Sequence, residues 1–163
     1  MVAAATDGAL LVRTAADMRA LGRRLAGLLR AGDLVLLSGD LGAGKTTLTQ
    51  GIGAGLRVRG PITSPTFVIA RVHPPLGAGP PLVHADAYRL AGWDELEDLD
   101  LEASLDHAVT VVEWGTGLVE GLADDRLEIT IWRAHGADAK SSEVRTVRIR
   151  PVGARWIGVA LPD

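Results

Sequence analysis

The sequence lacks cysteine entirely, and it has no long apolar run. Without cysteine the protein has no disulfide, no thiolate nucleophile and no cysteine-ligated zinc site. No apolar stretch approaches the ~18–20 residues of a membrane-spanning helix, so we expect no membrane span and no membrane partner. Residues 1–17 carry acids and an arginine where a signal peptide would have an apolar core, and we therefore expect a cytoplasmic protein.

Neither sign of charge dominates the chain. The formal net charge is −3, which argues against a domain that grips nucleic acid through a basic face alone. The 47 % of hydrophobic and 23 % of charged residues are typical of a soluble globular protein. The length of 163 residues predicts one domain over 1–163, with a core at about 10–150 and a C-terminal tail at 151–163.

One stretch carries a chemical signature. Residues 39–46 read Gly-Asp-Leu-Gly-Ala-Gly-Lys-Thr and match the pattern G-x-x-x-x-G-K-[ST] of a phosphate-binding loop. Its glycines let the backbone bend so that successive N–H groups point at an anion. Lys45 would place its ammonium against the β- and γ-phosphates of a nucleotide, and Thr46 would offer its hydroxyl to Mg²⁺. A glycine-rich turn that carries Lys-Thr by chance is the alternative.

The flanking residues favour the phosphate-binding loop over that chance match. Residues 34–38 are apolar and predict a buried strand directly before Gly39. Leu48, Ile52 and Leu56 follow at helical spacing and predict a helix after the loop. The loop therefore joins a strand to a helix, which is the structural context that a true phosphate-binding loop requires.

The remaining pattern predicts an α/β protein. A helix is expected at about 15–31, with Thr14 as N-cap and Asp17 as capping-box partner, ending near Gly32. Strands are predicted at 10–12, 34–38, 67–72, 82–89, 109–114, 127–132 and 144–150. The last two alternate with period two, as neighbouring antiparallel strands do. This order predicts a three-layer P-loop NTPase-like fold with a mixed sheet, parallel at the loop strand and antiparallel towards one edge.

Two acids end predicted strands and are candidates for managing a metal ion. They are Asp86, after Leu-Val-His-Ala, and Glu113, after Val-Thr-Val-Val. Parallel strands end on the side of the sheet where the loop lies, so both acids are expected to converge on the phosphates. For either acid alone, a merely solvated strand end is the alternative. For the neighbouring His84, a core or strand position is the alternative to a role in the site.

Two other stretches leave alternatives open. Thr63, Ser64 and Thr66 form a hydroxyl cluster that either responds to a γ-phosphate or simply shapes a turn. Residues 94–106 hold seven acids and no base, and form either a solvated face or a docking face for a basic partner. The chain has no asparagine and so lacks the Asn-Lys-x-Asp guanine signature, which favours ATP over GTP.

Four motifs together resemble one family. They are the loop at 39–47, Ser-Pro-Thr-Phe at 64–67, His-Ala-Asp-Ala-Tyr-Arg-Leu at 84–90 and Val-Glu-Trp at 112–114. In this order and spacing, from about residue 14 to residue 149, the chain resembles the TsaE (YjeE) family. These are small bacterial ATPases of tRNA threonylcarbamoyladenosine synthesis. One departure is Gly115, where the family often has proline.

The resemblance implies roles for individual residues. ATP would contact Gly39, Gly42, Ala43, Gly44, Lys45, Thr46, Thr47, Thr66 and Asp86. Lys45 and Asp86 would be catalytic, with Asp86 the acid needed for hydrolysis. Thr46 and Glu113 would ligate Mg²⁺, and residues 64–67 would form a switch-like loop. Family members act with the TsaB–TsaD pair, so tRNA would be engaged indirectly through that complex.

Two further functions are compatible with a phosphate-binding loop. A small-molecule kinase would need a lid and a basic acceptor pocket, whereas residues 94–106 are acidic. A nucleotide-gated adapter would bind ATP without needing its hydrolysis. The sequence disfavours the kinase and does not separate the adapter from the ATPase.

Overall fold

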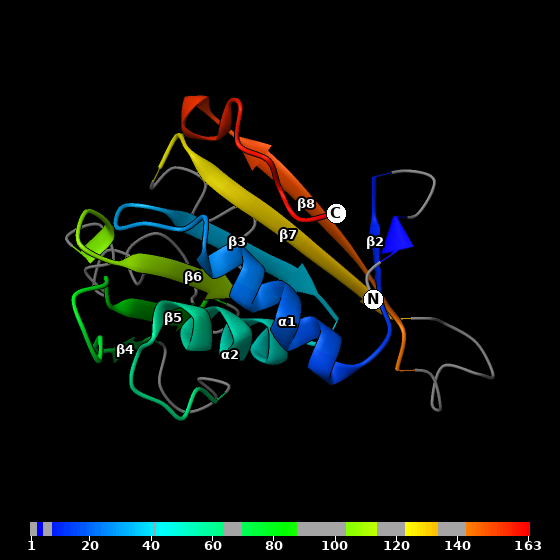
Figure 1. Cartoon of the computed structure of the whole chain (residues 1–163), viewed down its shortest axis with the longest axis horizontal. Helices are drawn as coiled ribbons and strands as arrows, with labels where there is room; N and C mark the ends of the chain where they lie inside the picture. The colour runs from blue at the N-terminus through cyan, green and yellow to red at the C-terminus, as the bar shows by residue number, and fades with distance from the viewer. Residues whose placement is uncertain are drawn as a thin grey trace.

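The computed structural model describes residues 3–4, 8–40, 42–63, 70–87, 104–113, 123–133 and 143–163. Its core is an eight-stranded sheet with two helices side by side on one face (Figure 1). The elements are β1 (Ala3–Ala4), β2 (Leu10–Val12), α1 (Ala15–Ala26), β3 (Leu34–Gly39), α2 (Lys45–Leu56), β4 (Ala70–His73), β5 (Leu82–Asp86), β6 (Val109–Glu113), β7 (Arg126–Arg133), β8 (Arg145–Val152) and a short 3-10 helix, η2 (Ala154–Trp156).

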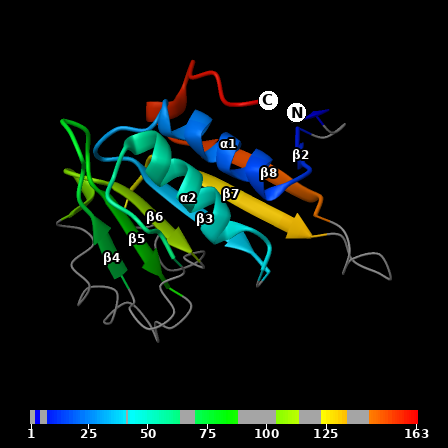
Figure 2. The ribbon, with the colours of Figure 1, turned by 60° about the horizontal axis from the view of Figure 1, so that its bottom comes forward.

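The sheet is mixed, with a parallel centre. The strand order is β1-β2-β8-β7-β3-β6-β5-β4, and β7, β3, β6 and β5 run parallel to one another (Figure 2). The predicted mixed α/β fold is confirmed. Antiparallel pairs flank the parallel centre on both sides, β2–β8–β7 at one end and β4–β5 at the other, whereas we predicted them towards one edge. The short connection over 74–81 explains this, because it is too short for a parallel crossover.

The first helix begins as predicted and ends early. The Thr14 hydroxyl accepts the Asp17 N–H at 3.0 Å, which confirms the predicted N-cap. The helix ends at Ala26, not near residue 31. The apolar spacing continued beyond the helix because Leu29 is still buried, held by a turn in which its N–H bonds to the Leu25 carbonyl.

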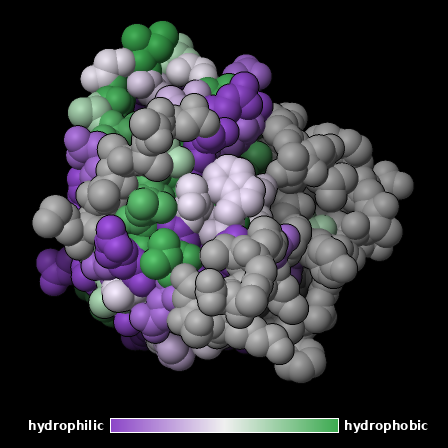
Figure 3. All heavy atoms as spheres, turned by 90° about the vertical axis from the view of Figure 1, so that its right-hand side faces the viewer, coloured by the Kyte–Doolittle hydropathy of each residue, from purple (hydrophilic) through white to green (hydrophobic). Residues whose placement is uncertain are grey.

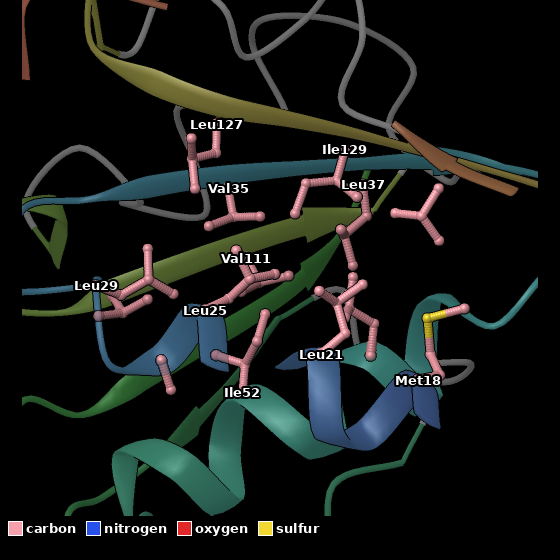
Figure 4. Close-up of a cluster of buried hydrophobic side chains, with 14 of the residues drawn as sticks. Met18, Leu21, Leu25, Leu29, Val35, Leu37, Ile52, Val111, Leu127 and Ile129 are labelled. Atoms are coloured by element: carbon pink, nitrogen blue, oxygen red, sulfur yellow. The ribbon is translucent and has the colours of Figure 1, made fainter. Parts of the chain in front are cut away.

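Apolar side chains are buried on both faces of the sheet. On the helix-covered face, Leu21 and Leu25 of α1 and Ile52 of α2 point towards sheet residues such as Leu37 and Val111 (Figure 4). The other face has its own cluster, which consists of Leu34, Leu36, Val83, Ala85, Ala87, Leu105, Ala108 and Val112. The central strand β3 contributes to both clusters, which is why its sequence is a continuous apolar run.

The two helices pack so closely that glycine is needed between them. A Cβ atom on Gly51 would lie 2.8 Å from the Arg19 Cα, and one on Gly22 would lie 2.7 Å from the Ile52 nitrogen. Real Cβ atoms do not approach backbone this closely. Two glycines of α2, Gly51 and Gly55, are therefore explained by its packing against α1, although glycine makes a poor helix by propensity.

Residues after β8 return to the core. Trp156 is buried in the main cluster, and the Arg155 guanidinium bonds to both carboxylate oxygens of Asp33 at 3.0 and 3.1 Å. Arg155 also donates to the Leu28 carbonyl at 2.8 Å. These contacts attach the C-terminal residues to the segment that precedes β3. No helix within the described ranges is long and apolar enough to cross a membrane.

We predict that Gly51→Ala destabilises the protein although alanine is the better helix former. The added methyl would overlap the Arg19 backbone, and overpacking of this kind lowers the free energy of unfolding by about 1–3 kcal/mol. Urea denaturation measures the change. Gly27→Ala is the control, because its Cβ would meet only the Arg24 carbonyl oxygen at 3.4 Å. Equal stability of the two variants would contradict the packing argument.

Candidate functional site

The loop at 39–46 joins β3 directly to α2, as the motif predicts. Gly42 and Gly44 have φ angles of 76° and 115°, a region that residues with a side chain rarely adopt. The Ala43 N–H donates to the Asp40 carbonyl at 3.0 Å and closes the turn. Leu41 lies outside the described residues. The sequence at these positions therefore produces a tight loop whose end is the first turn of a helix.

The two helices differ at their N-termini. Thr14 caps α1, and Asp17 lies in its first turn. The N-cap of α2 is Gly44, which makes no side-chain cap bond, and the first turn of α2 has no acid. The first N–H groups of any helix have no acceptor within that helix, and they carry a partial positive charge. The start of α2 is therefore suited to an anion from outside the helix.

Lys45 holds its ammonium inside the loop. Its Nζ donates to the carbonyl oxygens of Gly39 at 2.7 Å and Asp40 at 2.9 Å, and the residue is 6 % exposed. Burial lowers the pKa of Lys45, and the nearby carboxylates of Glu113, Asp40 and Asp86 act in the opposite direction. A buried cation thus lies within electrostatic range of three acids.

The parallel strands bring the two predicted acids to the loop. Asp86 and Glu113 are register partners on β5 and β6, and Glu113 is also opposite Leu37 on β3, two residues before Gly39. Both acids are buried, with 9 % and 3 % exposure. The edge of the sheet where these strands end faces the viewer in Figure 3, where hydrophilic and hydrophobic residues of the described part lie side by side.

A histidine contacts one of these acids. His84 on β5 is fully buried, and its Nε2 lies 3.1 Å from Glu113 Oε1. The sequence did not decide whether His84 is a core residue or part of the functional site. The structure shows it in contact with a predicted site residue.

The other predicted site residues divide into two groups. Thr46 and Thr47 lie half-buried in the first turn of α2, beside Lys45. Thr66 and the proposed switch segment at 64–67 lie outside the described residues, as does most of the acidic stretch at 94–106. Their predicted roles stay predictions.

A cavity of about 130 Å³ adjoins the loop. One wall comes from the start of α1, one from the loop and α2, and one from the residues at the start of β8. The lining residues are Thr14, Ala15, Met18, Gly42, Ala43, Gly44, Thr47, Glu143 and Arg145. The cavity continues from the start of α2 into a space that is bounded partly by apolar side chains, such as that of Met18.

Two arginines at the loop had no sequence signal. Arg145 donates through Nε to the Ala43 carbonyl at 3.1 Å, and Arg133 Nη1 would lie 3.4 Å from a Cβ on Gly42. The two arginines are register partners on β7 and β8. Burial lowers the pKa of Arg145, Arg133 lowers it further, and Glu143 opposes both. Only the pairing of β7 with β3 brings them to the loop, so no local pattern could have identified them.

The donor set suits a hard cation that is bound together with a ligand. Thr46, Glu113 and Asp86 offer hydroxyl and carboxylate oxygens, which Mg²⁺ prefers. Among the described residues, no group of three or more His, Cys, Asp or Glu side chains forms a metal site by itself. Mg²⁺ usually binds through one or two carboxylates completed by phosphate oxygens and water. The residues present fit that arrangement.

Comparisons with known proteins agree on one family. A family model described as "Threonylcarbamoyl adenosine biosynthesis protein TsaE" matches residues 12–142. The chain is 68 % identical over 140 residues to the Streptomyces coelicolor "tRNA threonylcarbamoyladenosine biosynthesis protein TsaE", covering 85 % of this chain and 93 % of that protein. It is 49 % identical over 131 residues to the protein of that name from Mycobacterium tuberculosis, covering 76 % and 78 %.

A solved structure is similar over nearly the whole chain. The crystal structure of Bacillus subtilis YdiB superposes with a TM-score of 0.69 at 30 % sequence identity. The match covers 96 % of this chain and 91 % of that one. The overall fold is therefore shared with that protein.

We predict that Arg145→Met loosens the loop. Methionine keeps an unbranched stem but removes the guanidinium that holds the Ala43 carbonyl. Losing one such hydrogen bond lowers the free energy of unfolding by about 1 kcal/mol, and amide hydrogen exchange over 42–47 should accelerate. Mass spectrometry of exchanged peptides measures this. Arg148→Met is the control, since Arg148 stacks over Trp132 on the same hairpin. Unchanged exchange at the loop would contradict the role of Arg145.

Proposed function

Because this chain belongs to the TsaE family of threonylcarbamoyl adenosine biosynthesis proteins, we propose that it binds ATP with Mg²⁺ at the 39–47 loop and hydrolyses it slowly. Its function lies in tRNA threonylcarbamoyladenosine biosynthesis. One observation carries the nucleotide chemistry. The buried Lys45 ammonium, at an uncapped helix start, is within electrostatic range of both Asp86 and Glu113.

The loop would hold the phosphates. Backbone N–H groups from Gly44 to Thr47 and the Lys45 ammonium together supply a concave set of donors. The carboxylates of Glu113, Asp40 and Asp86 favour the charged form of Lys45 before a phosphate arrives. The nucleoside would extend into the cavity beside Met18 at the start of α1. This arrangement uses both the polar and the apolar wall of the site.

The Thr46 hydroxyl and the Glu113 carboxylate would hold Mg²⁺. When bound, the ion neutralises charge on the β- and γ-phosphates. Glu113 is suited to this role because it is almost fully buried at a strand end, where its carboxylate has few positions available. Thr46 lies in the first turn of α2, next to Lys45.

Asp86 would act on the water. It lies at the end of β5, beside Glu113, and retains slight exposure. A carboxylate there can accept a hydrogen bond from the water that attacks the γ-phosphorus, while the bond to the β–γ bridging oxygen breaks and ADP leaves. Lys45 would stay on the phosphates during this step. The reaction needs no acceptor other than water.

The partners in this proposal are homologues of TsaB and TsaD. ATP hydrolysis would support repeated turnover of that pair, not the transfer of the threonylcarbamoyl group itself. The net charge of −3 gives this chain little electrostatic attraction for tRNA, so tRNA would meet it through the complex.

We predict that Lys45→Ala weakens Mg·ATP binding by at least about 100-fold. Among the described residues, Lys45 is the only side-chain cation inside the loop, and the substitution removes it. Isothermal titration calorimetry measures the affinity. Arg30→Ala serves as the control. It removes a positive charge from an exposed residue that precedes β3, whereas the loop follows β3. If Lys45→Ala binds Mg·ATP like the unaltered protein, the proposed site is wrong.

We predict that Asp86→Asn retains Mg·ATP affinity within about 3-fold but slows hydrolysis by about 10²–10⁴-fold, as expected for loss of a general base. Phosphate release measures the rate. In a reconstitution with TsaB and TsaD homologues and tRNA, the variant should support a first round of modification and then stop. If it sustains many rounds without hydrolysis, the nucleotide-gated adapter is the correct function.

A further inference from the structure

His84 and Glu113 form a buried pair beside the loop, and the proposed function gives His84 no role. Both side chains are buried, at 0 % and 4 % exposure, and they meet at 3.1 Å between Nε2 and Oε1. A histidine at this depth normally needs both ring nitrogens satisfied. His84 Nδ1 has no hydrogen-bond partner within the part of the chain described. The one hydrogen bond observed for this imidazole is therefore the bond to Glu113.

Strand register creates the contact. His84 is paired with Val111 in β5–β6, and Glu113 is paired with Asp86, so His84 and Glu113 are diagonal neighbours. Side chains two positions apart on a strand share a face, which puts His84, Asp86 and Glu113 on the same side of the sheet. Val111 belongs to the cluster under the helices, so this is the side that α2 covers.

The chemistry of the two groups indicates which one donates. A carboxylate at 3.1 Å is an acceptor, so Nε2 carries the hydrogen and donates it to Glu113 Oε1. In a neutral imidazole, an Nε2–H that donates to Glu113 leaves Nδ1 as an acceptor without a hydrogen, which is less costly when buried than an unpaired N–H donor. Oε1 of Glu113 thereby accepts from His84, so a cation at this carboxylate would be bound through Oε2.

We propose that His84 is a positioning residue that holds the Glu113 carboxylate in the orientation from which its second oxygen receives the divalent cation. This inference rests on the proposed function, in which Glu113 ligates Mg²⁺. Carboxylate ligands of metals are commonly oriented by such a hydrogen bond, and loss of the partner weakens metal binding by about 10- to 100-fold.

Lys45 explains why the orientation has to be imposed. Its ammonium is within electrostatic range of Glu113, and Glu113 is the carboxylate that affects it most. Without His84, the carboxylate would be drawn towards that cation, and it would lose the orientation that suits a metal. His84 therefore keeps Glu113 available to Mg²⁺ and Lys45 available to phosphate.

The test compares ADP affinity with Mg²⁺ and with EDTA in the full chain. The dissociation constant of ADP in EDTA, divided by that with Mg²⁺, isolates the metal's contribution. We expect His84→Leu to lower this ratio by about 10- to 100-fold while the affinity in EDTA changes by less than about 3-fold. His84→Gln places an N–H donor at a similar reach and should recover most of the ratio. His107→Leu, at an exposed histidine before β6, is the control.

Three outcomes are decisive. An unchanged ratio in folded His84→Leu overturns the inference, and so does an equal loss with and without Mg²⁺, which would mean a purely structural role. If Mg²⁺ leaves the ADP affinity of the unaltered protein unchanged, the metal site of the proposed function is wrong, and the inference is wrong as well. Double variants with Glu113→Gln sharpen the result, because His84→Leu should add no further loss in that background.

A measurement on the unaltered protein covers the case in which the His84 variants do not fold. The chain has four histidines, so ¹⁵N spectra of labelled imidazoles are simple. We expect His84 to show the Nε2–H tautomer and to shift when Mg²⁺ is added to the ADP complex, while His107 does not shift. An Nδ1–H tautomer at His84, or no response to Mg²⁺, refutes the inference.

Discussion

The parallel pairing of β3, β6 and β5 is the constraint on which the site depends. Each strand ends at the same edge of the sheet, so strand pairing alone brings the loop after β3 close to the acids that end β5 and β6. The register adds precision, because Asp86 is opposite Glu113 and Glu113 is opposite Leu37. A slip of β5 or of β6 by one residue would turn the acid of that strand to the other face of the sheet.

Burial of charge is tolerated here because each charged group has a partner. Lys45 is held by two carbonyl oxygens, and Glu113 is held by His84. An isolated buried charge would be strongly unfavourable. The same pairing keeps these groups where a phosphate and a metal would need them, so the protein's stability and its proposed chemistry draw on one set of contacts. Asp33 with Arg155 follows the same rule at the opposite end of β3.

The helices serve the site through their packing. Gly22 and Gly51 allow α1 and α2 to lie in close contact, which fixes the direction in which α2 begins. The start of α1 is capped by its own Thr14, whereas the start of α2 is left to the loop and to Lys45. Both helix starts line the same cavity, but only the start of α1 has a side-chain cap of its own.

The sequence by itself determined the loop, its flanking strand and helix, the two strand-end acids and the mixed α/β class, because each depends on local spacing or on residue type. The prediction of where α1 ends was wrong, because Leu29 is apolar and buried although it lies outside the helix. The prediction also placed antiparallel pairing at one edge of the sheet only, whereas β4 pairs with β5 at the other edge. The contacts of His84 with Glu113 and of Arg145 with Ala43 were decided by tertiary structure alone. Those partners are 29 and 102 residues apart, and only strand pairing and register bring them within hydrogen-bond distance.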